Sequence, residues 1–116
     1  HGDGETSRDF CFVANAVQAN VLAALADASV QGQLFNVAFG ERTSLNRLFG
    51  LLRAGLARHQ CHYASEPAYA PFRAGDIRHS QASIAKAERM LGYAPTHDIE
   101  AGLAEALPYY LSASTR

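Results

Sequence analysis

An apolar stripe in the middle of the chain restricts the fold more than any other feature of the sequence. Its members recur at the three- and four-residue spacing of an α-helix, and they are Leu45, Leu48, Phe49, Leu52 and Leu56. Ser44 stands immediately before them, where a hydroxyl can accept a hydrogen bond from a free amide of the first helical turn. The spacing therefore predicts a helix that begins after Ser44 and presents one apolar face.

The length and charge of the chain narrow its possible functions. With 116 residues, of which 48% are hydrophobic, we expect one domain over residues 1–116, standing alone or as part of a larger protein. A net charge of −1 gives no general attraction to nucleic acid or to an anionic membrane, so neither is an expected partner. No apolar run reaches the length of a membrane span, and no signal peptide is recognisable.

The cysteines and the first residue indicate where such a chain belongs. Cys11 and Cys61 lie far apart with no disulfide framework around them, which predicts buried free thiols and a cytoplasmic protein. The chain starts at His1 without a methionine. We therefore interpret it as a processed product, a trimmed chain or a fragment of something longer.

Three further helices are predicted on either side of the central one. The first covers residues 15–27 with Asn15 as its N-cap. Its apolar residues recur every four positions, and they are Val17, Val21 and Leu25. A helix over 81–91, which Gly92 is expected to end, and another from residue 99 follow later in the chain. Pro108 is expected to kink or shorten the last one, because proline cannot donate the backbone hydrogen bond that a helix interior needs.

Short strands are predicted between these helices. Apolar and aromatic residues indicate strands over 8–13 and 33–39, and 61–67 is interpreted as an edge strand that Pro67 ends. Strands in alternation with helices indicate an α/β fold.

One polar loop carries the residues best suited to a phosphate-bearing ligand. It reads PFRAGDIRHS over residues 71–80. If the fold brings Arg8 and Arg73 together, their two guanidinium groups can hold a diphosphate through charge-assisted hydrogen bonds. Gly75 allows a tight turn, and Asp76 can accept hydrogen bonds from ribose hydroxyls. The alternative, which spacing alone favours, is a surface turn with a local ion pair between Arg73 and Asp76.

Other kinds of site are poorly supported by the sequence. His59, Cys61 and His62 lack the second pair of ligands that a zinc site requires, so we assign His59 and His62 to the polar connection after the central helix. No glycine-rich dinucleotide fingerprint follows a strand. Lys86 is the only lysine and no tyrosine stands four residues before it, so the chain has no Tyr-x-x-x-Lys pair.

Four stretches of the chain together resemble one known family. They are GDGETSRDFCFVANAVQAN, LFNVAFGERTSLNRLF, FRAGDIRHSQASIAKAERMLGYAP and IEAGLAEALPYYL. In order and spacing they are similar to the C-terminal part of extended short-chain dehydrogenase/reductases, above all UDP-sugar 4-epimerases of the type acting on UDP-N-acetylglucosamine and its relatives. The resemblance implies the end of a Rossmann sheet plus a small α+β substrate lobe, without the Rossmann part that binds NAD.

The resemblance assigns substrate-binding roles to five residues. It implies that Arg8 and Arg73 reach the nucleotide diphosphate and that Phe10 lies near the nucleoside. It places Asp76 at the ribose. At the position of Ser80, related epimerases that are restricted to glucose and galactose carry a tyrosine, whereas a small residue leaves room for an N-acetyl group. The alternative role of Ser80 is an N-cap of the following helix, which Ser83 could fill instead.

The resemblance also implies a function that this chain does not complete. The family enzyme uses NAD to oxidise and then reduce the sugar at C4, but no cofactor site and no catalytic residue are implied here. We expect the UDP-sugar-binding part of an epimerase, inactive alone. Two alternatives stay open. One is a stand-alone module that self-associates, or pairs with a Rossmann-containing partner, through an exposed apolar face. The other is part of a sugar-nucleotide dehydratase or decarboxylase.

Overall fold

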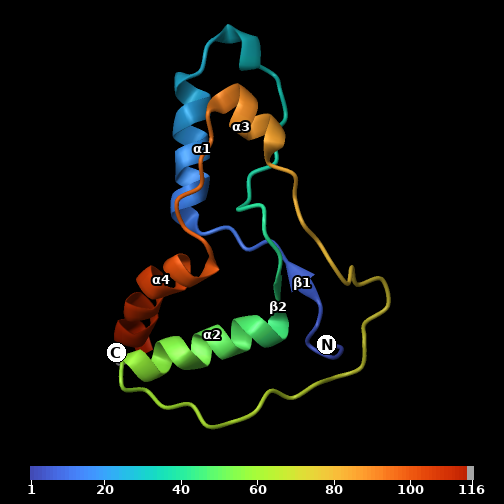
Figure 1. The fold of residues 1–116 in the computed structure, drawn as a ribbon, viewed down its shortest axis with the longest axis vertical. Helices are drawn as coiled ribbons and strands as arrows, with labels where there is room; N and C mark the ends of the chain where they lie inside the picture. Colours follow the sequence, from blue (N-terminus) through green and yellow to red (C-terminus); the bar gives the residue numbers. More distant parts are fainter. Residues whose placement is uncertain (115–116) are drawn as a thin grey trace.

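The regular elements of the chain are helices and one small sheet, and the computed structural model describes residues 1–114 (Figure 1). The α-helices are α1 (Val13–Leu25), α2 (Leu45–Arg58), α3 (Ala85–Leu91) and α4 (Ile99–Ser114), and a 3₁₀ turn, η1 (Ala28–Val30), follows α1. The strands β1 (Ser7–Arg8) and β2 (Thr43–Ser44) pair antiparallel, with Ser7 opposite Ser44. The α/β class expected from the sequence is confirmed.

The central helix forms as its spacing predicts. α2 begins at Leu45, and the Ser44 hydroxyl accepts a hydrogen bond from the Arg47 amide at 3.1 Å. α3 ends at Leu91, because the next residue, Gly92, adopts the left-handed conformation with φ of 69°. Local chemistry therefore sets the start of one helix and the end of another.

Other helix boundaries differ from the prediction. α1 begins at Val13, so Asn15 lies inside the helix and is not its N-cap. α3 begins only at Ala85, with Ile84 and not a serine at its N-cap. α4 contains Pro108 and continues to Ser114, so the proline does not shorten it.

Most of the predicted strand content does not form within residues 1–114. Of 8–13 only the beginning pairs, as β1, while 33–39 and 61–67 carry no ladder. The backbone amides of 34–38 have no hydrogen-bond partner in the described part of the chain. A strand needs a neighbouring strand to satisfy its backbone, and residues 1–114 supply none at this segment.

The main core lies between α1 and α3. Its buried members are Ala19, Ala87, Leu91 and Tyr93, and partly buried residues from the flanking segments pack around them. Tyr93 is only 2% exposed, and its hydroxyl donates to the Ala38 carbonyl at 2.7 Å. This bond fixes the extended segment 33–39 to the core at its C-terminal end.

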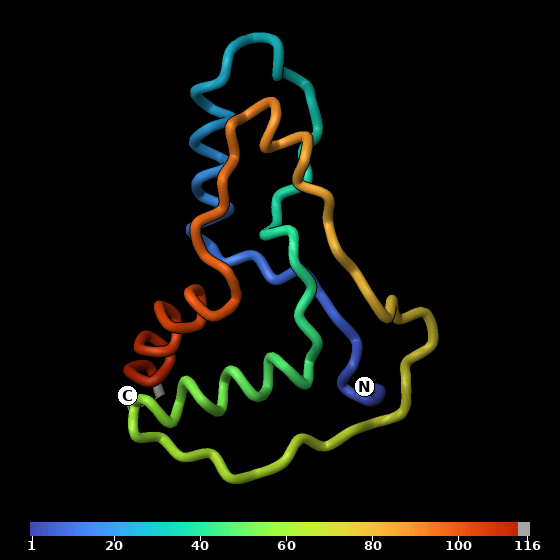
Figure 2. The backbone as a smooth tube through the Cα atoms, viewed as in Figure 1, coloured from blue at the N-terminus to red at the C-terminus, as the bar shows by residue number. Residues whose placement is uncertain are grey.

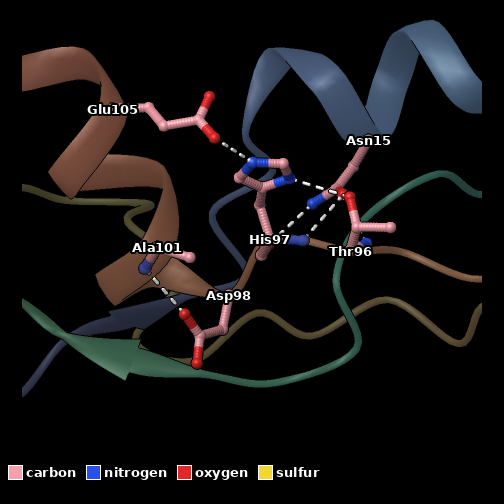
Figure 3. Close-up of polar contacts among 6 residues, drawn as sticks. All are labelled: Asn15, Thr96, His97, Asp98, Ala101 and Glu105. Atoms are coloured by element: carbon pink, nitrogen blue, oxygen red, sulfur yellow. Dashed lines mark hydrogen bonds and ion pairs between the residues drawn. The ribbon is translucent and has the colours of Figure 1, made fainter.

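A buried asparagine joins α1 to the segment before α4 (Figure 3). Asn15 is fully buried, and its Nδ2 donates to the His97 carbonyl at 2.7 Å. Its Oδ1 accepts from the amides of Thr96 and His97 at 2.9 and 3.2 Å. One side chain thus satisfies three backbone groups of a segment that lies about eighty positions away in the sequence.

The start of α4 is held by the same cluster. Asp98 Oδ1 accepts from the Ala101 amide at 2.8 Å, as an N-capping side chain does. The His97 ring bonds Glu105 Oε1 at 2.6 Å and stacks against Phe12 at 4.9 Å between centroids. Figure 3 shows His97 between Asn15 of α1 and Glu105 of α4.

The molecule is extended for its length. Its radius of gyration is 17.1 Å and it measures 52 × 36 × 21 Å, whereas a compact domain of this length would have a radius of gyration of about 13 Å. Figure 2 shows why: the connection over 59–84 sweeps around α2 and the small sheet before it reaches α3. No helix within residues 1–114 is long and apolar enough to cross a membrane.

One apolar face of α1 points away from the rest of the chain. Its members are Val13, Val17, Val21 and Leu25, with between 51% and 81% of each residue exposed. Leu34 of the unpaired extended segment is 88% exposed. The apolar repeat thus predicts the helix correctly, but the chain does not bury it.

Candidate functional site

The strand that carries the predicted site residue Arg8, β1, lies between β2 and the end of the polar loop. Ser7 of β1 pairs with β2 on one side and bridges His79 on the other. On that second side the Ser7 amide donates to the Arg78 carbonyl at 2.9 Å, and the Ser80 amide donates to the Ser7 carbonyl at 3.1 Å. The loop over 71–80 is therefore fixed to β1 at its C-terminal end.

Arg8 follows Ser7 on this central strand. The residue is half-buried, and its Nη1 donates to the carbonyls of Ser7 and Arg78 at 2.8 and 3.4 Å. Its guanidinium group thus lies against the end of the polar loop. The structure brings Arg8 to residues 78–80, whereas its approach to Arg73 stays a prediction.

Asp9 supports Arg8 from the next position. Its two carboxylate oxygens accept from the amides of Phe39 and Gly40 at 3.0 and 2.9 Å. Gly40 has a φ of 98°, which suits a residue without a side chain. A carboxylate inside a predicted strand is unusual, and its actual partner is a turn thirty positions away.

The other predicted pair sits at the tip of the loop. Arg73 Nε and Asp76 Oδ2 form an ion pair at 3.1 Å, and the Asp76 amide donates to the Arg73 carbonyl at 3.3 Å. Gly75, with a φ of 83°, makes the turn between them. The local ion pair predicted as the alternative does form. The Arg73 side chain is 65% exposed, so its guanidinium group is accessible to another partner.

The remaining predicted residues flank β1. Phe10 is half-buried, two positions after Arg8. Ser80 is exposed beside Ser7 and does not cap α3, whose N-cap is Ile84. Arg8, Phe10 and Ser80 thus lie on or beside β1, while Arg73 and Asp76 lie at the loop tip. Their roles stay predictions.

The base of the loop contains an ion pair that sequence reasoning missed. Arg78 Nη2 donates to Asp3 Oδ2 at 2.8 Å, and this bond lowers the pKa of the Asp3 carboxyl below its usual value of 3.8, with help from the Glu5 amide. The Arg78 guanidinium also lies over the Phe72 ring, 5.2 Å from its centroid. Seventy-five positions separate the ion-pair partners, so no local pattern could have paired them.

Open hollows adjoin this base. One of about 190 Å³ lies between the N-terminal turn and the start of α2, with Leu45, Phe49 and Tyr69 among its lining residues. A shallower one of about 430 Å³ runs along Tyr69, Phe72 and the N-terminal turn. A small ligand therefore has room beside the loop.

The two cysteines and the possible metal ligands were the other candidates for a site. Both cysteines are free, and both are exposed, so the prediction of buried thiols is wrong. The residue as a whole is exposed, but partial removal of its sulfur from water raises the pKa of Cys11. Its thiolate is therefore less available at neutral pH. Within residues 1–114, no three His, Cys, Asp or Glu side chains gather in a group that could hold a metal ion.

Comparison with known proteins points to one family. No family model matches the chain. It is 31% identical over 113 residues to the UDP-glucose 4-epimerase of Mycolicibacterium smegmatis, covering 97% of this chain. Among solved structures, the UDP-glucose 4-epimerase of Thermotoga maritima with UDP-glucose matches at a TM-score of 0.85 and 35% identity over 97% of the chain. This chain is related to the UDP-sugar 4-epimerases.

A further epimerase structure agrees, and the coverage shows which share of these enzymes is matched. The UDP-N-acetylglucosamine 4-epimerase of Methanobrevibacter ruminantium, in complex with UDP-N-acetylmuramic acid, matches at a TM-score of 0.79 and 33% identity over 97% of this chain. The chain spans about a third of each relative, 34% in all three. It aligns with their C-terminal part.

The single lysine of this chain is not part of a Tyr-x-x-x-Lys pair. The UDP-glucuronic acid 4-epimerase of Bacillus cereus, with a TM-score of 0.84 and 22% identity over 97% of this chain and 34% of its own, was solved with NAD. Here the only lysine, Lys86, donates to the Leu34 carbonyl at 2.8 Å and to Gln33 Oε1 at 3.0 Å. The position four residues before it is Ala82. The chain thus lacks a Tyr-x-x-x-Lys pair, and its lysine forms hydrogen bonds to the extended segment 33–39.

Proposed function

We propose that this chain is the part of a UDP-sugar 4-epimerase that holds the nucleotide sugar. The observation that carries the proposal is the likeness, at 35% identity over 97% of the chain, to an epimerase solved with UDP-glucose. The chain's own part is to bind and orient the substrate, while NAD and the catalytic pair would belong to a Rossmann portion.

Geometry supports this division of roles. Arg8 is held on a central strand beside the end of the loop, and Arg73 is exposed at its tip. An incoming diphosphate offers Arg73 a doubly charged partner in place of one carboxylate, so we expect the Arg73–Asp76 pair to open when UDP binds. Asp76 is then free to accept hydrogen bonds from the ribose, and Phe10 contacts the nucleoside.

Ser80 bears on which sugar is accepted. Its side chain is small and exposed beside β1, which is consistent with a pocket that admits an N-acetyl group. We propose UDP-N-acetylhexosamines as the preferred class. The chain alone is expected not to interconvert UDP-N-acetylglucosamine and UDP-N-acetylgalactosamine when NAD is added, because its sequence has no Tyr-x-x-x-Lys pair. Cytoplasmic location belongs to the same proposal, since its two free cysteines suit a reducing compartment.

Titration with UDP tests the proposal. We expect saturable binding by calorimetry, weakened about 10- to 100-fold in Arg73→Ala, because a hydrogen bond to a charged group contributes about 1.5–3 kcal/mol. Arg89→Ala is the matched control, an exposed arginine on α3 away from the loop. Absence of binding by the unaltered chain, or equal losses in both variants, would refute the proposal as stated.

The exposed face of α1 favours a second candidate, an assembly module. Single apolar residues on a surface are ordinary, but a stripe along a whole helix beside an unpaired extended segment calls for a covering partner. We propose that a Rossmann-containing partner covers it in the epimerase. Without that partner, copies of this chain are expected to associate through the same face.

Sedimentation velocity at several concentrations distinguishes the assembly candidate. We expect the sedimentation coefficient to rise with concentration for the unaltered chain. Val21→Asp should abolish this rise, because a charge in a buried apolar contact is costly. Ile77→Asp places the same charge at an exposed apolar residue of the loop and should leave it intact. A strict monomer at every concentration would argue against self-association.

A further inference from the structure

Two arginines of the loop at residues 71–80 occupy different environments, although they stand only five positions apart. Arg73 points outward at the tip and is paired only across its own turn. Arg78 lies at the base, where its guanidinium bonds Asp3 at 2.8 Å and covers the Phe72 ring at 5.2 Å. Both are candidate phosphate ligands by residue type, but the Arg73 side chain is 65% exposed and pairs across its own turn, whereas the Arg78 side chain is 46% exposed and contacts both Asp3 and Phe72.

The base of the loop is closed by contacts from both of its stems. On the incoming stem, the Gly2 amide donates to the Ala70 carbonyl at 2.6 Å, and the His1 ring bonds the Pro71 carbonyl at 3.0 Å. On the outgoing stem, the Arg78 carbonyl accepts from the Ser7 amide at 2.9 Å. The Arg78 side chain then crosses from this stem to Phe72 and to Asp3.

The N-terminal turn is shaped to accept that crossing. Gly2 has a φ of 91°, and a Cβ atom there would lie 2.4 Å from the Phe72 ring, so no larger residue fits without a shift. Asp3 is held in place because its carboxylate also accepts from the Glu5 amide at 3.0 Å, and its carbonyl accepts from Asn46 Nδ2 at 3.1 Å. Asp3 is therefore held by contacts other than the one with Arg78.

We propose that Arg78 is a positioning residue, which together with Asp3 and Phe72 clasps the loop so that Arg73 and Asp76 are presented to the ligand. Arg78 does not contact the ligand itself, because its guanidinium is used at the base of the loop. This inference rests on the proposed UDP-binding function and adds the device that organises the loop.

Measurement of loop order tests the clasp without any ligand. NMR relaxation should give backbone order parameters near 0.8 for the amides of 73–77 in the unaltered chain, falling below about 0.6 in Arg78→Gln and Asp3→Asn. Arg89→Gln, which removes a charge from α3, should change nothing in the loop. The double variant Asp3→Arg with Arg78→Asp reverses the pair and should restore the order. Unchanged order parameters in both single variants would overturn the clasp.

UDP affinity then separates positioning from direct electrostatics. Asp3→Asn removes a negative charge, so long-range electrostatics alone would make it bind the anionic UDP more tightly. The clasp requires the opposite: Asp3→Asn and Arg78→Gln should each weaken binding by about 2- to 5-fold, with no further loss when these two substitutions are combined. Tighter or unchanged binding by Asp3→Asn would overturn the inference. If the unaltered chain does not bind UDP, the proposed function fails, and the relaxation measurement decides the clasp on its own.

Discussion

Replacement of Tyr93 by alanine is expected to lower the free energy of unfolding by about 3–5 kcal/mol. Tyr93 is 2% exposed and fills the space between α1 and α3, against small neighbours such as Ala19 and Ala87. Alanine would leave a cavity that these side chains cannot fill. The loss is a large share of the roughly 5–15 kcal/mol that holds a domain together.

Urea unfolding followed by far-UV circular dichroism measures this effect, since the chain has no tryptophan for fluorescence. Tyr93→Phe is the matched control, because it keeps the ring and loses only the hydroxyl bond to the Ala38 carbonyl. We expect that loss to cost about 1–2 kcal/mol. If alanine and phenylalanine prove equally costly, the ring does not fill the core as described.

The same residue predicts an alkaline limit to stability. Burial is the main cause that raises the pKa of Tyr93 to about 12, from its usual value of 10.0. Between these values the unfolded chain releases the proton while the folded chain keeps it. Stability contributed by the neutral tyrosine is therefore complete below pH 10 and is lost as the pH rises toward 12. Tyr93→Phe should remove this part of the pH dependence.

Asn15→Ala is expected to cost about 2–4 kcal/mol, because it leaves three backbone groups of Thr96 and His97 without partners. Asn15 is 0% exposed, so water cannot simply take its place. The same unfolding experiment in urea measures the cost. We expect the segment before α4 to detach from α1 in this variant.

Gln18→Ala supplies the comparison on the same helix. Gln18 makes a similar two-way bond, donating to the Ala94 carbonyl and accepting from the Ala94 amide, each at 2.8 Å. These bonds are exposed, so water can replace them and the cost should be about 1 kcal/mol or less. Equal costs for the two substitutions would show that burial does not set the value of the Asn15 cluster.

The stability of the core also bears on the candidate site. Tyr93 holds the Ala38 carbonyl, and the next two amides, of Phe39 and Gly40, donate to Asp9. Asp9 follows Arg8 directly. A change at Tyr93 should therefore loosen the strand that carries Arg8, the residue predicted to bind phosphate, although no substrate would touch that tyrosine.

The elements predicted correctly are those whose signals are local. The stripe of α2, its Ser44 cap and the Gly92 end of α3 depend on residues within a few positions of one another. The Arg73–Asp76 turn is of the same kind, since Gly75 and an ion pair three positions long suffice to close it. The family resemblance likewise came from motifs readable in order along the chain.

Strand pairing and long-range contacts could not be predicted from such local signals. Residues 33–39 have strand composition, yet a strand forms only beside a partner, and the described chain offers none there. Asn15 looked like a helix cap but serves a segment near residue 97.

By itself the sequence determined that the four helices form, though not all of their ends, which family the chain resembles and which residues are suited to phosphate. The tertiary structure alone decided that Arg78 pairs with Asp3, that Asp9 binds the turn at Gly40, and that the apolar stripe of α1 faces outward. Helix signals act over a few residues, whereas these contacts depend on how distant segments of the chain meet in space.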